Sequence, residues 1–366
     1  MRAMAWPILR ASPQSNMRRA RQSNSLCTVS SPAHMTDIRA ALQRTLGDAF
    51  TLEHELTGGG MSTVFVANDN TLNRKVVVKV LPSALATTVS TDRFNREILM
   101  SAALQHPHIV PVLSAGEVDG LPYFMMPFID GESLRTRLTR GPLSVSEAVG
   151  VMRDVARALT YAHGRDVVHR DIKPDNILLT GGAAVVTDFG VAKALTASRP
   201  AQRRAPVTPG GSPAAITLQG IAIGTPAYMA PEQAAGDPNT DHRADLYALG
   251  VVAWEMLAGA APFQGASPQQ VMAAQLVNRP PSLVTRRYNV PRALVTIIEQ
   301  LLEKEPALRP RTAADLARAL NNPDIISGAF GSVPGGAWRQ QRMRVAAVAF
   351  FLALAGFLFW WIRGRK

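Results

Sequence analysis

Two short runs of residues carry side chains that suit chemistry on phosphate groups. The first run, H-R-D-I-K-P-D-N, contains Asp171, Lys173 and Asn176, and the second, D-F-G, begins with Asp188 twelve positions later. Asp171 can receive a hydroxyl proton, and Lys173 can neutralise the charge of a phosphate. Asn176 and Asp188 offer oxygen ligands, which Mg²⁺ prefers. In this order, the residue types predict phosphoryl transfer from ATP.

The residues around Lys79 predict the element that positions it. Three valines (76–78) precede Lys79, and Val80 and Leu81 follow it. Such a run is typical of a buried β-strand. A lysine in a buried strand is costly without a partner, so a solvated surface charge is the poorer interpretation of Lys79.

The formal net charge of +12 belongs almost entirely to the two ends of the chain. Residues 1–34 contain five arginines and residues 339–366 contain six basic residues, and neither segment contains an acid. Because little net charge is left for the interior, we expect no nucleic-acid partner. The single Cys27 permits neither an internal disulfide nor a cysteine metal site.

Residues 345–362 form an unbroken run of 18 uncharged residues. As a helix this run would be about 27 Å long, close to the thickness of a hydrocarbon core. Basic residues flank it, and Trp360 and Trp361 suit an interfacial aromatic belt. A buried core helix is the alternative, but such a helix normally shows a polar stripe. We therefore expect one transmembrane helix, joined to the preceding domain by a juxtamembrane linker at residues 320–344.

Residues 1–34 leave three interpretations open. Translation could begin at Met35, the segment could be a basic disordered arm, or it could be a transit-like peptide. A signal peptide is disfavoured because the apolar stretch 3–9 has only seven residues and contains Pro7. We favour a mis-set start or a disordered arm over targeting.

The motifs together resemble those of the bacterial eukaryotic-like (Hanks-type) Ser/Thr protein kinases, many of which carry a C-terminal membrane helix. The resemblance covers residues 50–319, and the motifs follow the family's order. It implies an α+β bilobal protein-kinase fold, with a β-rich N-lobe that has one helix, a helical C-lobe, and ATP between them. The Pro- and Gly-rich stretch 194–223 would be an extended insert in the activation segment.

The resemblance implies a glycine-rich loop that closes over the phosphates of ATP. The corresponding residues are Leu56, Thr57, Gly58, Gly59, Gly60, Met61, Ser62, Thr63 and Val64. Of the three glycines of the family motif only Gly59 is present, because Thr57 and Ser62 replace the outer two. Nucleotide binding is therefore the function in which this chain departs most from the family pattern.

The remaining nucleotide contacts are also implied by the resemblance. Lys79 would bind the α- and β-phosphates, with Glu97 on an amphipathic helix as its ion partner. Met126 would be the gatekeeper beside the adenine, with ordinary core packing as the alternative interpretation. The carbonyl of Pro127 and the amide of Ile129 would face the adenine ring.

The resemblance also assigns the catalytic roles. Asp171 would be the catalytic base or the group that orients the hydroxyl, and Lys173 would stabilise the transferring phosphoryl group. Asn176 and Asp188 would bind Mg²⁺. Thr225, in the G-T-P-A-Y segment, would form hydrogen bonds near Asp171 and Lys173. Thr225 and Lys173 both resemble Ser/Thr kinases rather than Tyr kinases.

Four further residues are expected to support the fold rather than to react. The resemblance implies an ion pair between Glu232 and Arg309, and it implies that Asp245 anchors the backbone of the catalytic loop from a buried helix. His169 is expected to pack rather than to catalyse. The other histidines show no metal-binding spacing.

The resemblance implies one regulatory site. Thr217 lies eight residues before Thr225, where related kinases often carry a phosphorylated threonine, and Arg170 would receive its phosphate. Thr208 and Ser212 in the same insert are weaker candidates.

An active Ser/Thr protein kinase is the favoured function, with autophosphorylation and a dimer that phosphorylates in trans. The kinase domain would lie in the cytoplasm, tethered to the cell inner or plasma membrane by a single pass. A pseudokinase scaffold is the alternative from another class, suggested by Thr57 and Ser62. A small-molecule phosphotransferase is disfavoured by the A-P-E and G-T-P-A-Y segments.

Overall fold

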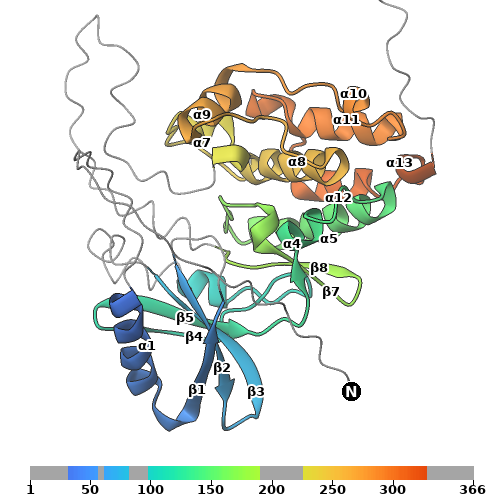
Figure 1. Ribbon diagram of the computed structural model, residues 1–366. Helices are drawn as coiled ribbons and strands as arrows, with labels where there is room; N and C mark the ends of the chain where they lie inside the picture. Colours follow the sequence, from blue (N-terminus) through green and yellow to red (C-terminus); the bar gives the residue numbers. More distant parts are fainter. Residues whose placement is uncertain (1–31, 57–61, 82–97, 190–225, 328–366) are drawn as a thin grey trace, which may run out of the picture.

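The computed structural model describes residues 32–56, 62–81, 98–189 and 226–327. They form two lobes: a β-sheet with α1 at one end of the molecule and a group of helices at the other (Figure 1). We call these the N-lobe, which ends at Pro127, and the C-lobe. The expected bilobal α+β architecture is confirmed for the described residues.

The N-lobe is built on a five-stranded antiparallel sheet with the strand order β1-β2-β3-β5-β4. Its strands are β1 (Phe50–Glu55), β2 (Thr63–Asp69), β3 (Arg74–Val80), β4 (Ser114–Val118) and β5 (Leu121–Pro127). The predicted strand around Lys79 is confirmed as β3, the central strand. The register places Lys79 opposite Val64 on one side and Phe124 on the other. The position of the lysine is thus fixed by hydrogen bonds to both neighbouring strands.

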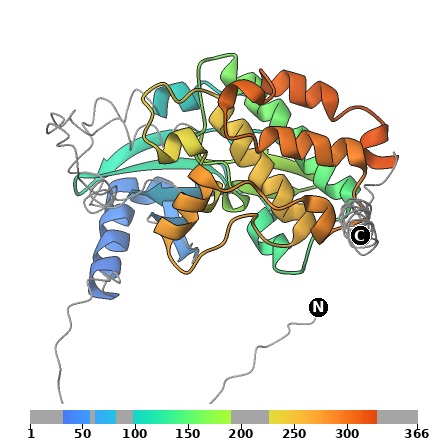
Figure 2. The same cartoon turned by 90° about the horizontal axis from the view of Figure 1, so that it is seen from above.

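A helix that the sequence analysis did not predict, α1 (Pro32–Leu46), lies against this sheet (Figures 1 and 2). Leu42 is completely buried and joins Phe65 and Met125 in one apolar cluster. Gln43 donates to the carbonyl of Phe50 and accepts from the amide of Leu52, at 2.8 and 2.9 Å. The N-lobe therefore has this helix in addition to the helical residues 98–102, and not the single helix that we expected.

The C-lobe is organised around a long buried helix, α8, which runs through the middle of the helices in Figure 2. The helices are α4 (Leu134–Leu138), α5 (Val145–His163), α7 (Pro231–Ala234), α8 (Arg243–Ala258), α9 (Pro268–Val277), α10 (Leu283–Arg286), α11 (Arg292–Leu301), α12 (Ala313–Ala319) and α13 (Asp324–Ser327). Short 3₁₀ turns are η1 (Gly47–Ala49) in the N-lobe and η2 (Pro174–Asn176), η4 (Pro226–Tyr228) and η5 (Pro306–Leu308) in the C-lobe. A small antiparallel sheet of β6 (Glu132–Ser133), β7 (Ile177–Thr180) and β8 (Ala183–Val186) lies at the junction of the lobes.

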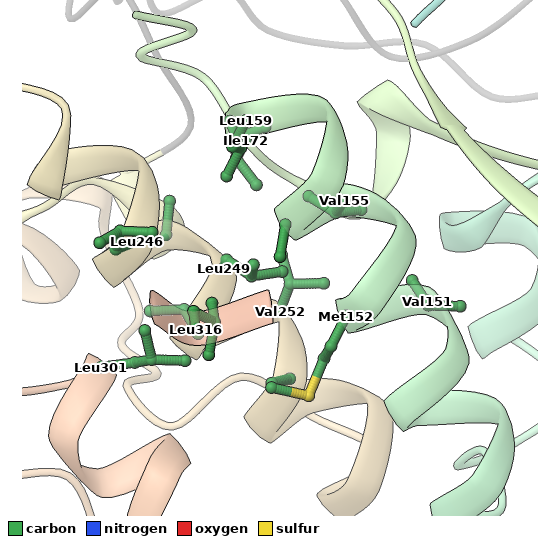
Figure 3. Close-up of a cluster of buried hydrophobic side chains, with 14 of the residues drawn as sticks. Val151, Met152, Val155, Leu159, Ile172, Leu246, Leu249, Val252, Leu301 and Leu316 are labelled. Carbon is green, nitrogen blue, oxygen red and sulfur yellow. The ribbon is translucent and has the colours of Figure 1, made fainter. Parts of the chain in front are cut away.

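The core between α5 and α8 explains why the C-lobe can carry an accurately placed loop. Met152 and Val155 of α5 lie close to Leu249 and Val252 of α8 (Figure 3), and all four are completely buried. Each such side chain contributes about 1.5–3 kcal/mol by leaving water. The helix α5 begins at a capping box in which Ser144 and Glu147 satisfy each other's backbone amides.

A glycine allows α8 and α11 to approach closely. A Cβ atom on Gly250 would lie 2.7 Å from the Cβ of Leu301, well inside van der Waals contact. Any larger residue at this position would separate the two helices.

Several predicted segments lie outside the described residues. These are most of the N-terminal arm (1–31), the activation-segment insert (194–223) and the predicted transmembrane segment (345–362). Within the described ranges, no helix has both the length and the apolar character needed to cross a bilayer. The predicted linker, 320–344, begins with the ordered helix α13, whose Ile325 is buried.

Candidate active site

Three of the predicted catalytic residues meet on the loop between α5 and β7. The Nζ of Lys173 donates to Oδ2 of Asp171 at 2.6 Å, and the Nδ2 of Asn176 donates to the same oxygen at 3.1 Å. Asn176 also donates to the carbonyl of Asp171 at 2.8 Å. Among the described residues, these bonds engage Oδ2 and leave Oδ1 able to accept a proton from a substrate.

The fully buried carboxylate of Asp245, on α8, anchors this loop. It accepts from the backbone amides of His169 and Arg170 at 2.8 and 2.7 Å and from Nε2 of His163 at 2.9 Å. Burial works to raise the pKa of Asp245, but the hydrogen bond from His163 and the neighbouring donors lower it below its ordinary value of 3.8. Asp245 is therefore ionised at neutral pH, and the expectation that it anchors the catalytic loop is confirmed.

His169 is buried under this loop and does not face the candidate site. Its Nδ1 accepts from the amide of Asp171 at 3.2 Å, and Nε2 lies 2.8 Å from the carbonyl of Thr187. One ring nitrogen thus accepts and the other donates, which fixes the neutral tautomer. The ring also contacts Phe189 edge-on, with centroids 4.7 Å apart. His169 links the Asp171 loop to the Asp188 loop.

The N-lobe contributes one cation to the site. The Nζ of Lys79 donates to Oδ2 of Asp188 at 2.7 Å, and both side chains are largely shielded from solvent. The contact joins residues 109 positions apart and connects the N-lobe to the C-lobe at the candidate site. The predicted partner of Lys79, Glu97, lies outside the described residues.

The oxygen donors near Asp171 suit a magnesium ion. The Oδ1 of Asp188 is buried and has no hydrogen-bond partner in the described part of the chain. Such an orphaned carboxylate oxygen is costly unless a cation or donor pairs with it. Asn176 uses its amide nitrogen for the bonds to Asp171, so those bonds do not engage its carbonyl oxygen. A carboxylate and an amide oxygen form the hard donor set that Mg²⁺ prefers.

The predicted adenine side of the site lies where β5 leaves the N-lobe. Met126 is buried, and Thr187, next to Asp188, donates to its sulfur at 3.3 Å. Pro127 ends β5 opposite Val76, and Ile129 follows it in the connection to the C-lobe. A small cavity lined partly by Met126 and Asp188 opens between them. The predicted gatekeeper therefore lies beside the predicted metal ligand.

The predicted phosphate loop is described only at its two ends. The amide of Leu56 on the β1 side donates to the carbonyl of Val64 on β2 at 2.8 Å, and Ser62 and Thr63 lead into β2. The five positions between them are Thr57, Gly58, Gly59, Gly60 and Met61, which lie outside the described residues. The two flanking strands, β1 and β2, pair in antiparallel orientation on either side of this loop.

On the side opposite the N-lobe, the segment from η4 to α7 borders the catalytic loop. Glu232 forms a bidentate ion pair with Arg309, at 2.6 and 2.8 Å, as predicted. Gln233 donates to the carbonyl of Arg170, next to Asp171, at 3.2 Å. Thr225 and Thr217 lie outside the described residues.

Comparison with known proteins agrees with this geometry. A model of the protein kinase domain matches residues 50–321. This chain belongs to the protein kinase family. It is 38% identical over 278 residues to the serine/threonine-protein kinase PknB of Mycobacterium tuberculosis, covering 74% of this chain and 42% of PknB. It is 40% identical over 268 residues to the serine/threonine-protein kinase PknD of the same organism, covering 72% of this chain and 38% of PknD.

A solved structure supports the same assignment for the fold. The kinase domain of Mycobacterium tuberculosis PknI has a TM-score of 0.57 and 29% sequence identity, covering 75% of this chain and 96% of that domain. The chain spans about two fifths of the length of PknB and PknD. The similarity therefore concerns the kinase domain and not the whole of those relatives.

The kinase domain contains a partly buried polar cluster that the sequence analysis missed. Arg135 on α4 donates to Glu255 on α8 at 2.7 Å, contacts the hydroxyl of Tyr228, and lies 3.4 Å from Asp175. Burial and the Glu255 carboxylate raise the pKa of Tyr228, so its hydroxyl stays protonated and donates to Glu255 at 2.5 Å. Arg135 and Glu255 are 120 positions apart, and no local sequence pattern connects them.

Two residues of the kinase loops adopt a backbone conformation that is unfavourable for side chains other than glycine. Arg170 has φ of 66° and Asp188 has φ of 67°. Each such conformation costs on the order of 1–3 kcal/mol and persists only where the surroundings enforce it. Asp245 provides that constraint at Arg170 and Lys79 provides it at Asp188.

Proposed function

We propose that this protein phosphorylates serine and threonine hydroxyls on proteins, including its own chain, with ATP as the phosphoryl donor. The observation that carries the proposal is the arrangement around Asp171. The carboxylate of Asp171 is fixed by Lys173 and Asn176, and the backbone carbonyl of Asn176 accepts from the amide of Thr187, next to Asp188. Asp188 accepts from the cation Lys79 through Oδ2, and its Oδ1 has no hydrogen-bond partner among the described residues. These groups supply proton acceptance, positive charge and metal ligation, which phosphoryl transfer requires together.

In the proposed reaction, the hydroxyl oxygen of the substrate forms a bond to the γ-phosphorus of ATP. The bond between that phosphorus and the β–γ bridging oxygen breaks, and ADP leaves. The hydroxyl proton passes to Oδ1 of Asp171, while Lys173 neutralises charge on the transferring group. Mg²⁺, held through Asn176 and Asp188, would add positive charge beside the phosphates.

The nucleotide would be bound by residues from both lobes. Lys79 would bind the α- and β-phosphates, and the loop 56–64 would cover them. The carbonyl of Pro127 and the amide of Ile129 would meet the adenine, beside Met126. The choice of serine and threonine over tyrosine is supported by Lys173, by Thr225, and by the similarity to the serine/threonine-protein kinases PknB and PknD.

The test uses the full-length protein, purified in detergent. Wild type with Mg·ATP is expected to label its own Ser/Thr residues, whereas Asp171→Asn should lose about 10²–10⁴-fold in rate because the proton acceptor is removed. The variant should still unfold at the wild-type temperature, since Asn can keep the bonds from Lys173 and Asn176. Undiminished labelling by Asp171→Asn would exclude the assignment.

We also propose that the kinase is tethered to the cell inner or plasma membrane by residues 345–362, with its catalytic domain in the cytoplasm. The support is the uncharged 18-residue run with basic and tryptophan flanks. The full chain should fractionate with membranes, and a chain that ends before Arg339 should not. Recovery of both chains in the same soluble fraction would rule the tether out.

Phosphorylation of Thr217, in trans within a dimer, is the proposed activating step. The Nε of Arg170 is buried without a hydrogen-bond partner among the described residues, and a phosphate oxygen could accept from it. Thr217→Ala should slow phosphorylation of an added substrate, whereas Thr208→Ala and Ser212→Ala should not. Equal activity of all three variants would exclude Thr217 as the switch.

A further inference from the structure

A chain of hydrogen bonds runs from Lys304, in the segment after α11, to the η4 turn. The Nζ of Lys304 donates to the hydroxyl of Tyr247 at 2.9 Å, and that hydroxyl contacts Oε1 of Gln275. The Nε2 of Gln275 then donates to the carbonyl of Ala227 at 2.6 Å. Three separate elements, α8, α9 and the segment after α11, are thus joined to one backbone carbonyl of η4.

The ammonium group gives this chain a single direction. Burial lowers the pKa of Lys304 to about 8, so at pH 7 it is mainly an ammonium group, which can only donate. The hydroxyl of Tyr247 therefore accepts from it and directs its own hydrogen towards Gln275. The amide oxygen of Gln275 must therefore face Tyr247, which leaves its NH₂ group facing Ala227. A flipped amide would place two carbonyl oxygens against each other at Ala227. Lys304 therefore sets the orientation of the Gln275 side-chain amide through Tyr247, without contacting that amide itself.

The surroundings make this arrangement rigid. Tyr247 and Gln275 are both completely buried. Lys304 also donates to the backbone carbonyl of Gln275 at 2.6 Å and lies 4.3 Å from the ring centroid of Phe263. Water cannot replace a broken bond at such a site, so each partner is costly to remove.

The η4 turn, to which Gln275 is bonded, borders the catalytic loop. Tyr228, next to Ala227, contacts Arg135, and Arg135 lies 3.4 Å from Asp175 in the Asp171 loop. At the other end of the segment, Gln233 donates to the carbonyl of Arg170. Residues 226–234 therefore lie beside the catalytic loop, where they can contact a protein whose hydroxyl reaches Asp171, whereas ATP bound between the lobes need not contact them.

We propose that Gln275, oriented by Tyr247 and Lys304, is a positioning residue for the protein substrate. Its side chain donates to the carbonyl of Ala227 and thereby fixes the position of the η4 turn relative to Asp171. This inference rests on the proposed kinase function, because it concerns the acceptor side of that reaction. It assigns no contact with ATP or the metal to Gln275.

The test measures phosphorylation of an Asp171→Asn copy of the full chain, which serves as the protein substrate. Tyr247→Phe removes only the hydroxyl that orients Gln275, and Gln275→Met removes the donor at similar volume. Each variant should raise KM for the protein substrate roughly five- to tenfold, as expected for one or two lost buried hydrogen bonds. KM for Mg·ATP should stay within about twofold of wild type, because neither bond reaches the nucleotide side.

The matched control is Tyr161→Phe. Its hydroxyl accepts from the amide of Gln105 at 3.2 Å, away from η4, so this variant loses the same group without affecting Ala227. A general loss of stability would lower kcat or raise both KM values in parallel, and the thermal midpoint would show it. If Gln275→Met does not fold, Tyr247→Phe decides alone.

The outcomes separate the two proposals. A wild-type protein that transfers no phosphate overturns the kinase function, and this inference with it. An active wild type whose Tyr247→Phe variant keeps the wild-type KM for the protein substrate overturns the inference alone. An equal rise of that KM in Tyr161→Phe overturns it as well.

Discussion

In the N-lobe, Lys79 stands on a central strand among apolar neighbours, whereas in the C-lobe the Asp171 loop rests on charged and amide groups that solvent does not reach. Nine polar or charged residues are buried among those the structure describes, and seven of them lie in the C-lobe, from His169 to Arg309. The two in the N-lobe are Asp69 and Ser101. The two halves of one active site are therefore positioned by different kinds of interaction.

This difference has consequences for how each lobe responds to substitution. The pairing of β3 with both neighbouring strands holds Lys79, so changes that keep the apolar side chains around it apolar should leave its position unchanged. A buried carboxylate such as Asp245 satisfies three particular donors, and no other residue can satisfy all of them. We expect substitutions in the C-lobe network to reduce stability and activity together, and those in the N-lobe to have graded effects.

The largest effect is expected for Asp245→Asn. The amide keeps one acceptor oxygen, but its NH₂ group must face the amide of either His169 or Arg170, both of which donate. The loss should be about 2–4 kcal/mol of unfolding free energy at pH 7, together with most of the phosphotransfer activity. Chemical denaturation and autophosphorylation of the same preparation measure both.

The pH dependence of Asp245→Asn follows from the lowered pKa of Asp245. The folded state favours the ionised form, so this carboxylate stabilises the protein above its ordinary pKa of 3.8 and loses that effect as the pH falls through the folded value. The difference between wild type and variant should therefore be constant from pH 6 to 8 and shrink only below about pH 4. A difference that shrinks already near pH 6 would assign the effect to another group.

The matched control is Asp69→Asn in the N-lobe. Asp69 is also buried, but its Oδ1 accepts from the amides of Thr71 and Leu72 in a turn, while Oδ2 lies 3.3 Å from Nε of the half-exposed Arg74. One amide oxygen can replace Oδ1, and the solvated arginine needs no partner. We expect a loss of less than about 1 kcal/mol. Equal losses for Asp69→Asn and Asp245→Asn would contradict the contrast between the lobes.

Leu42→Ala in α1 is expected to reduce stability about as much as Asp245→Asn, but to have a smaller effect on activity. Leu42 is completely buried against the sheet, so truncation should cost about 2–4 kcal/mol of N-lobe stability. KM for ATP should rise modestly, and KM for a protein substrate should not, because among the described residues α1 packs mainly against the N-lobe sheet and its neighbouring turn. Leu72→Ala, whose side chain is 61% exposed, is the control and should be neutral. Identical midpoints for the two variants would show that α1 is not part of the N-lobe core.

The sequence alone predicted the elements whose signals are local. The valine run around Lys79 identified β3, and the family motifs implied the anchoring role of Asp245 and the pair Glu232–Arg309, all of which the structure contains. The helix α1 was missed because the family resemblance begins at residue 50. Its apolar residues Ile38, Ala41, Leu42 and Leu46 recur at helical spacing and pack against the sheet, and this pattern could have identified it.

The remaining features depend on partners that are far apart in the chain. Gln275 and Ala227 are 48 positions apart, and Lys304 and Tyr247 are 57 apart. A hydrogen bond of this kind leaves no periodicity in either segment, and a buried glutamine has the same letter as a surface one. The pairing of Lys79 with Asp188 was likewise invisible, since both residues were assigned to other partners.

The smallest effect is expected at the end of the phosphate loop, where Ser62 replaces a family glycine. Glycine lacks a Cβ and would let the loop approach the phosphates more closely, at some entropic cost to the loop. Ser62→Gly should therefore lower KM for ATP by no more than about threefold and leave the thermal midpoint unchanged. Ser114→Gly, an exposed position at the start of β4, controls for a general loosening of the N-lobe and should change neither value. A clear rise in KM for ATP in Ser62→Gly alone would mean that the serine hydroxyl itself binds the nucleotide. The N-lobe would then contain a specific polar contact of the kind that the described structure places mainly in the C-lobe.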